Sequence, residues 1–201
     1  MIQSIVEGHG EVSAVPILIR RLGELMGLPG VEVASPIRRP RSKLVQKNGL
    51  EQAIELARIQ RGCRGILVLL DADDDCPKTF APVLQATARS AAQPLPCAVV
   101  LVKKEYEAWF LACVESLRER RGISATAVYE KPPEDVRGAK AALESLMGSG
   151  GKYLETSDQA ALTAVADWAM VHKRSRSFRK MAKEARRLFV SCGLKPQAWP
   201  R

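Results

Sequence analysis

The chain has 201 residues, of which 46% are hydrophobic and 26% charged, and its formal net charge is +9. This composition argues against extensive disorder, and a single domain of this length buries a core without disulfides or metal. The basic balance favours an anionic partner, nucleic acid first. No aliphatic run approaches the ~20 residues that cross a bilayer, and no secretion signal is present, so we expect a cytoplasmic protein without a membrane segment.

The first hundred residues alternate between short apolar runs and amphipathic stretches. The expected strands cover residues 2–6, 31–34, 66–70 and 98–102. The expected helices cover residues 11–27, 48–61 and 80–91, and the basic stretch 38–43 is an expected loop. Such alternation predicts an α/β fold of Rossmann-like type, with a mainly parallel sheet flanked by helices.

After residue 105 the sequence shows only helical patterns. These expected helices cover residues 107–121, 134–147, 157–171 and 176–192, with a flexible joint at 148–151. We expect them to form an additional helical layer on the same domain. The chain is therefore predicted to be a single domain, 1–201, with an α/β core at 1–105 and a helical C-terminal part at 106–201.

The five cysteines are widely scattered and include no Cys-x-x-Cys pair. Zinc sites and disulfide frameworks have clustered cysteines, so these residues are predicted to be free thiols. Metal chemistry, if present, must rely on other side chains.

Acidic side chains follow three of the expected strands: Glu7, the aspartates at 71, 73, 74 and 75, and the glutamates at 105 and 107. Chemistry in open α/β sheets gathers at the carboxyl ends of strands. Carboxylates that converge there repel one another unless a cation lies among them, and oxygen ligands suit Mg²⁺ or Mn²⁺. Two such ions can hold the attacking and leaving oxygens of a phosphodiester displacement.

Other interpretations of these acids remain open. The aspartates can form a solvated acidic loop, and Glu11 can be a first-turn residue favoured by the helix dipole. A haloacid-dehalogenase-type phosphatase also places Asp-x-Asp after a strand. An EF-hand loop is rejected, because its required Gly and Glu positions hold Cys76 and Pro82.

The order of these motifs resembles a known family. Glu7-Gly8 after the first strand and Asp71-x-Asp73 after a later one resemble the TOPRIM domain of topoisomerases, primases and OLD-type nucleases. Glu11, four residues after Glu7, resembles the OLD branch. Together with residues 105–112 and 153–162, the pattern most resembles an uncharacterised TOPRIM-like family, domain of unknown function 4276.

The resemblance implies a TOPRIM-like fold with a Mg²⁺ (or Mn²⁺) site. It assigns metal binding to Asp71 and Asp73, and general acid–base catalysis or metal binding to Glu7, with Glu11 in support. Asp75 is a further candidate ligand from the same loop. Between the two glutamates after the last strand, we favour Glu105 as the catalytic one, while Glu107 can anchor an arginine or cap a helix.

The resemblance also implies a partner and a setting. Members of this family resemble partners of a separate ATPase subunit in phage-defence-like gene clusters, and a role in DNA repair is a related expectation. The chain lacks the domains of topoisomerases and the zinc module of primases. A nuclease is therefore the main enzymatic expectation, and a non-catalytic nucleic-acid-binding or ATPase-partner subunit is the alternative.

Two basic strips occur in the sequence, at residues 38–43 and 173–187, and we expect them to lie beside the acidic cleft. A basic face can follow a phosphate backbone without reading its sequence, although a solvated helix is the equally plain interpretation of the second strip. The predicted nucleic-acid contacts are Arg38, Arg39, Arg41, Lys43, Arg176, Arg179, Lys180, Lys183 and Arg187.

Overall fold

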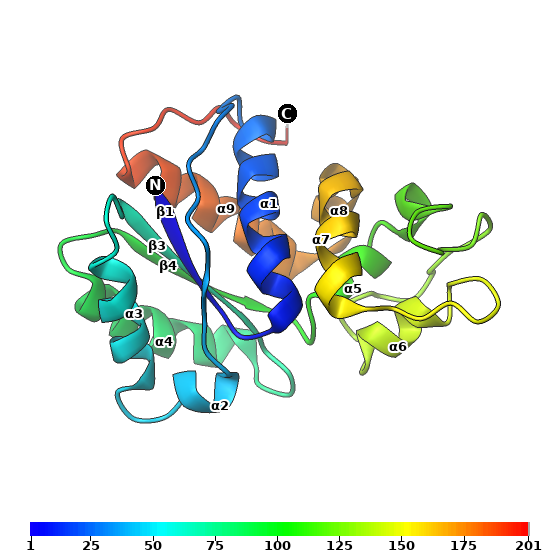
Figure 1. Cartoon of the computed structure of the whole chain (residues 1–201), viewed down its shortest axis with the longest axis horizontal. Coiled ribbons are helices and arrows are strands. Elements are labelled where there is room, and N and C mark those ends of the chain that lie inside the picture. The colour runs from blue at the N-terminus through cyan, green and yellow to red at the C-terminus, as the bar shows by residue number, and fades with distance from the viewer. Residues whose placement is uncertain (201) are drawn as a thin grey trace.

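A four-stranded parallel sheet organises the computed structural model, which describes residues 1–200. The strands are β1 (Ile2–Val6), β2 (Ile37–Arg38), β3 (Gly65–Asp71) and β4 (Cys97–Val102), in the spatial order β2-β1-β3-β4. All neighbours are parallel, with Ile5 opposite Val68 and Val68 opposite Val99. The predicted α/β fold with a parallel sheet is confirmed (Figure 1).

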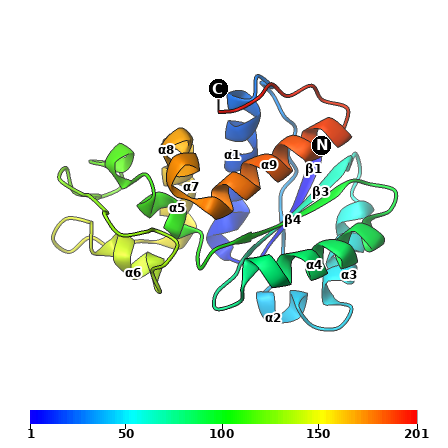
Figure 2. The same ribbon diagram turned by 180° about the vertical axis from the view of Figure 1, so that it is seen from behind.

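Helices cover both faces of this sheet, which explains why its central strands are aliphatic at every position. Side chains such as Leu67 and Leu69 face α1 (His9–Leu25) and α9 (Arg176–Ser191). The alternate side chains, such as Ile66 and Val68, face α3 (Gly49–Arg58) and α4 (Pro77–Ala92). Figure 2 shows α4 and α9 on opposite sides of β4.

The exposed edge of β4 is partly occupied by a side chain. The Gln85 amide donates to the carbonyl of Cys97 at 3.0 Å, and its oxygen accepts from the Val99 amide at 2.9 Å. These are the two backbone groups that a further strand would have used.

Two local predictions in the first half are wrong. The stretch 31–34 contributes only a single bridge between Val33 and Ile2. The second strand is instead β2, which begins one residue before the expected loop 38–43 and ends on its first residue. Apolar Ile37 explains the shift, since it pairs with Ile5 in the interior. The rest of that loop holds a short helix, α2 (Arg41–Leu44), which begins directly after Pro40.

The C-terminal helical layer is present, and the helix predicted at 176–192 is confirmed as α9, but the other helices of the layer are shorter than predicted. They are α5 (Glu107–Leu111), the 3-10 helix η1 (Val114–Leu117), α6 (Ala139–Glu144), α7 (Glu155–Val165) and α8 (Trp168–Arg174). The single helix expected at 157–171 is divided because Asp167 caps α8 through the amides of Ala169 and Met170. Among residues 1–200, no helix is both long and apolar enough to cross a membrane.

An aromatic cluster joins this layer to the sheet. Trp109 of α5 is fully buried and packs edge-on against Phe178 of α9, with ring centroids 5.2 Å apart. Trp168 of α8 stacks on Phe178 at 4.9 Å, and the Trp109 indole donates to the Ser177 hydroxyl at 2.9 Å. Trp109 and its neighbours Phe110 and Leu111 are all fully buried core residues.

Helices α1 and α7 lie side by side, and a glycine allows their close approach (Figure 1). A Cβ at Gly10 would lie 2.5 Å from the backbone oxygen of Glu155 and 2.4 Å from Oε1 of Gln159. We expect Gly10→Ala to force the helices apart and to lower the free energy of unfolding by about 1–3 kcal/mol. Urea denaturation measures this loss, and unchanged stability would contradict the close packing.

Candidate functional site

A cavity of about 260 Å³ opens where the carboxyl ends of β1 and β3 meet α2, α5 and α7. Most of its lining is charged or polar. The lining residues are Glu7, Gly8, Glu11, Pro40, Arg41, Asp71, Asp73, Glu107, Lys140, Glu155 and Gln159. Four of the predicted acids, Glu7, Glu11, Asp71 and Asp73, therefore share one cavity.

Glu11 is fixed by the turn between β1 and α1. One carboxylate oxygen accepts from the backbone amides of Glu7 at 3.0 Å and Gly8 at 2.8 Å. This is the reciprocal half of an N-terminal capping arrangement, so Glu11 does have the structural role considered from its sequence position. The residue is only 2% exposed, and its other oxygen faces the cavity side without a donor.

Five buried acceptor oxygens in this cavity lack any hydrogen-bond partner within residues 1–200. They are Glu7 Oε2, Glu11 Oε1, Asp71 Oδ1, Glu107 Oε2 and Gln159 Oε1. A buried polar atom without a partner costs about 1–3 kcal/mol, so five such atoms in one place need an explanation. All five are acceptors, and a cation is the partner that satisfies acceptors from several directions.

The same crowding favours protonated carboxyls. Burial raises the pKa of Glu7 to about 7, and the nearby Asp73 charge adds to the rise. Burial also raises the pKa of Glu11 to about 8 and that of Glu107 to about 7. The pKa of Asp71 lies well above its usual range because of burial and the neighbouring Glu11 and Glu7 charges.

Two basic side chains reach this cavity. Lys140 donates to Glu155 at 2.7 Å, and these two residues come from α6 and α7. Arg41 donates through Nε to the backbone oxygen of Asp71 at 3.1 Å, and its guanidinium is paired with Asp73 and Asp75. The carboxylates thus have cationic neighbours at the rim, while their buried oxygens have none.

The structure places Glu105 and Asp75 outside the cavity, contrary to the expectation from sequence. The Glu105 carboxylate accepts from the backbone amides of Gly138 and Lys140, both at 3.2 Å, and so caps the start of α6. Asp75 is engaged by Arg41. The cavity instead receives Glu107, which is fully buried and accepts from the Tyr153 hydroxyl at 2.9 Å.

Three further residues of the cavity could not be anticipated from the acidic motifs. Lys140, Glu155 and Gln159 enter the site from the C-terminal layer. Gln159 donates to Glu107 at 3.4 Å, while its own oxygen has no partner. Their sequence surroundings carry no recognisable ligand spacing, so only the packing of α6 and α7 reveals them.

The donor set fits a hard divalent cation, because every inward-facing ligand atom is a carboxylate or amide oxygen. As placed, however, no three His, Cys, Asp or Glu side chains among the described residues are close enough to enclose a metal ion. Within the described chain, the cavity thus holds oxygens that lack donors, but its carboxylates are not close enough together to enclose an ion.

The predicted basic contacts divide into engaged and available side chains. Arg38 donates to the backbone oxygen of Glu7 at 3.3 Å, and Arg179 donates to the carbonyls that end α8. Lys180 and Arg187 both pair with buried Glu184 at 2.8 Å. The side chains of Arg39, Lys43, Arg176 and Lys183 are exposed and form no ion pair within residues 1–200.

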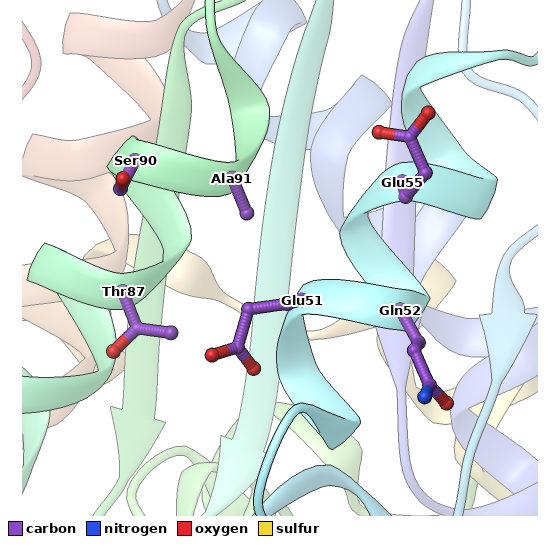
Figure 3. A pocket seen from close by; sticks show the side chains of 6 residues that line it. All are labelled: Glu51, Gln52, Glu55, Thr87, Ser90 and Ala91. Atoms are coloured by element: carbon purple, nitrogen blue, oxygen red, sulfur yellow. The ribbon is translucent and has the colours of Figure 1, made fainter.

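A separate hollow of about 620 Å³ lies between α3 and α4, away from the acidic cavity. Figure 3 shows Glu51 reaching from α3 towards Thr87 of α4, with Glu55 on the same helix. Glu55 is fully exposed and engaged by Arg58. None of the buried side-chain atoms without a partner lies in this hollow, so we do not place chemistry there.

Comparison with known proteins adds the family. No curated protein and no solved structure matches the chain. A family model described as Domain of unknown function (DUF4276) matches residues 6–184, which include the acidic cavity and most of the helical layer. The chain therefore belongs to the DUF4276 family.

Proposed function

We propose that this protein hydrolyses phosphodiester bonds of nucleic acid with Mg²⁺ or Mn²⁺ bound in the acidic cavity. The observation that carries the proposal is the group of five buried acceptor oxygens without donors. Glu7, Asp71 and Asp73 are the proposed ligands, supported by Glu11. A relationship to the TOPRIM domains of OLD-type nucleases belongs to the same proposal, and so does cooperation with a separate ATPase.

The bound cation supplies Lewis-acid stabilisation of the charge that develops on the phosphate. Glu107 is the proposed general base, because it lines the cavity without being one of the proposed ligands, and burial raises its pKa towards neutral pH. The water oxygen bonds to phosphorus as the bond to the leaving ribose oxygen breaks. The leaving ribose oxygen takes its proton from water, because Glu7 is held as a ligand of the cation.

Positive groups lie on both sides of the acids along the sheet edge, which supports a nucleic-acid substrate. Arg38 ends β2 and Arg39 follows it at one side of the sheet, and Lys103 follows the end of β4 at the other side. Four strands spaced about 4.8 Å apart span about 14 Å. Lys140 and Arg41, which line the cavity itself, are the proposed contacts of the reacting phosphate.

Cleavage assays with the purified protein test this proposal. Labelled single- and double-stranded DNA and RNA are incubated with Mg²⁺, with Mn²⁺ or with chelator. We expect cleavage in at least one metal and none in chelator. Binding without cleavage under every condition, repeated with the co-purified ATPase, would contradict catalysis and support a non-catalytic nucleic-acid-binding or ATPase-partner subunit.

A further inference from the structure

A groove of about 680 Å³ lies over the edge of β4, between α4 and α9, and is distinct from the acidic cavity. Figure 2 shows the two helices that form its walls. Its volume falls in the range of small-ligand sites. Its floor is apolar and includes Val99 and Leu101 of β4 and Ala81 and Pro82 of α4.

The walls of this groove are strongly basic. Lys78, Lys103, Arg176 and Lys180 line it, against one acid, Glu134. Glu134 is 6% exposed and accepts from the Ser175 hydroxyl and the Ser177 amide, both at 2.7 Å, so its charge caps α9. Lys78 and Arg176 have no ion pair among residues 1–200, which leaves them available to an anion.

The positive groups gather at one end of the groove. Lys78 lies in the first turn of α4, Arg176 is the first residue of α9, and Lys103 follows the end of β4. Helix α4 is 16 residues long and has no side-chain cap, so its N-terminus adds positive partial charge at that end, whereas the N-terminus of α9 is already capped by Glu134. The groove therefore favours a ligand with an anionic group, which would lie at the basic end, and an apolar part, which would lie over the floor.

This end of the groove is near the acidic cavity. Asp71 lines the cavity and Cys76 lines the groove, and their Cα atoms are only five steps apart along the chain. Because an extended chain spans at most about 3.6 Å per residue, their Cα atoms lie within about 18 Å of each other. A nucleic-acid strand bound at the cavity needs to extend only a short way to enter the groove.

We propose that this groove binds a nucleotide unit, with the base over the apolar floor and the phosphate between Lys78 and Arg176. The inference deepens the proposed function and rests on it for the source of the nucleotide in a substrate strand. A peptide adding to the edge of β4 fits less well, because Gln85 already bonds Cys97 and Val99. A free nucleotide offers the same chemistry as a strand nucleotide, and binding experiments separate the two.

Binding is measured in chelator, with a labelled oligothymidylate of about ten nucleotides and with adenosine monophosphate. We expect Lys78→Ala/Arg176→Ala to weaken oligonucleotide binding about tenfold and to reduce the salt slope by about 0.7, as loss of one single-strand phosphate contact requires. Ala81→Phe fills the floor without changing charge, so it is expected to weaken binding about tenfold with the salt slope retained.

The matched control is Arg120→Ala/Lys195→Ala, which removes the same charges from exposed positions outside the groove. Thermal unfolding verifies that each variant is folded. Adenosine monophosphate binding that the groove variants weaken identifies a free nucleotide ligand, and binding of the oligonucleotide alone identifies a strand. Both outcomes support the groove.

Three results would overturn the proposal. They are an equal loss of binding in groove and control variants, full binding by Ala81→Phe, and binding of an acidic peptide in place of both nucleotide probes. Its failure is separable from that of the proposed function. Metal-dependent cleavage with groove variants that behave like the control refutes the groove alone. Groove-dependent binding without cleavage in any metal refutes catalysis alone.

Discussion

Replacing Asp71 with Asn is expected to reduce metal-dependent cleavage by more than about a hundredfold. Asp71 ends β3, and one of its oxygens is buried without a donor beside Glu7 and Glu11. Altering even the outer partners of metal ligands costs about 10–100-fold, so loss of a ligand charge should cost more. Single-turnover cleavage and calorimetric Mn²⁺ titration measure the two effects.

Asp74→Asn is the matched control for this substitution. Asp74 is in the same loop, but it is exposed and pairs with Lys104 at 3.0 Å and Arg137 at 2.8 Å. Exposed ion pairs contribute little, so cleavage should stay within about twofold of the original protein. If Asp71→Asn cleaves as fast as Asp74→Asn, then Asp71 is not a ligand.

The second prediction with a large expected effect is that the Tm of the protein depends on pH and on a bound metal ion. The pKa values of Glu7, Glu11 and Glu107 are raised from 4.5 to between about 7 and 8, so the folded protein binds more protons than the unfolded chain in this window. This stabilising contribution is full below about pH 4.5 and is lost as the pH rises through 7 to 8. In chelator, we expect Tm to be higher at pH 5.5 than at pH 8.

A divalent cation should reverse this loss, because it binds the ionised carboxylates of the folded state. At about a hundred times its Kd, it adds about 2.7 kcal/mol, or roughly 5–10 °C in Tm for a chain of this length. Differential scanning calorimetry at pH 8, with Mn²⁺ and with chelator, measures the shift. A Tm that is independent of both pH and metal would be inconsistent with the cluster.

Glu11→Gln is the sharpest variant for this test. The Gln oxygen can still accept from the amides of Glu7 and Gly8, while its NH₂ group supplies a donor to the unpartnered oxygens nearby. We expect a higher Tm at pH 8 in chelator, by about 2–4 °C or more, and a much smaller shift with Mn²⁺. A lower Tm in chelator would show that the carboxylate is not under electrostatic strain.

The sheet and half of the candidate site were predictable from local patterns. The aliphatic runs of β1, β3 and β4 predict buried parallel strands, whose carboxyl ends bring Glu7 and Asp71 to one edge. Strand β2 was not predictable, because a pair as short as Ile37–Arg38 has no periodicity of its own. It is defined only by its pairing with β1.

A local feature of the backbone explains why Glu107 enters the cavity and Glu105, the residue predicted from the sequence, does not. Lys104 has a φ of 68°, a left-handed conformation that is uncommon outside glycine. The chain therefore turns sharply after β4, so that Glu105 meets the start of α6 and Glu107 enters the cavity. Sequence spacing gives no sign of this turn, and the contributions of α6 and α7 depend on tertiary packing.

The Gln85 amide at β4 also bears on how molecules of this protein meet one another. An open strand edge is a template for pairing with a second chain and for aggregation. Here one edge of the sheet is covered at Cys97 and Val99, and the opposite edge is only two residues long. Neither edge offers a long run of free backbone groups, so self-association by sheet extension is disfavoured, and any assembly must use the helical surfaces.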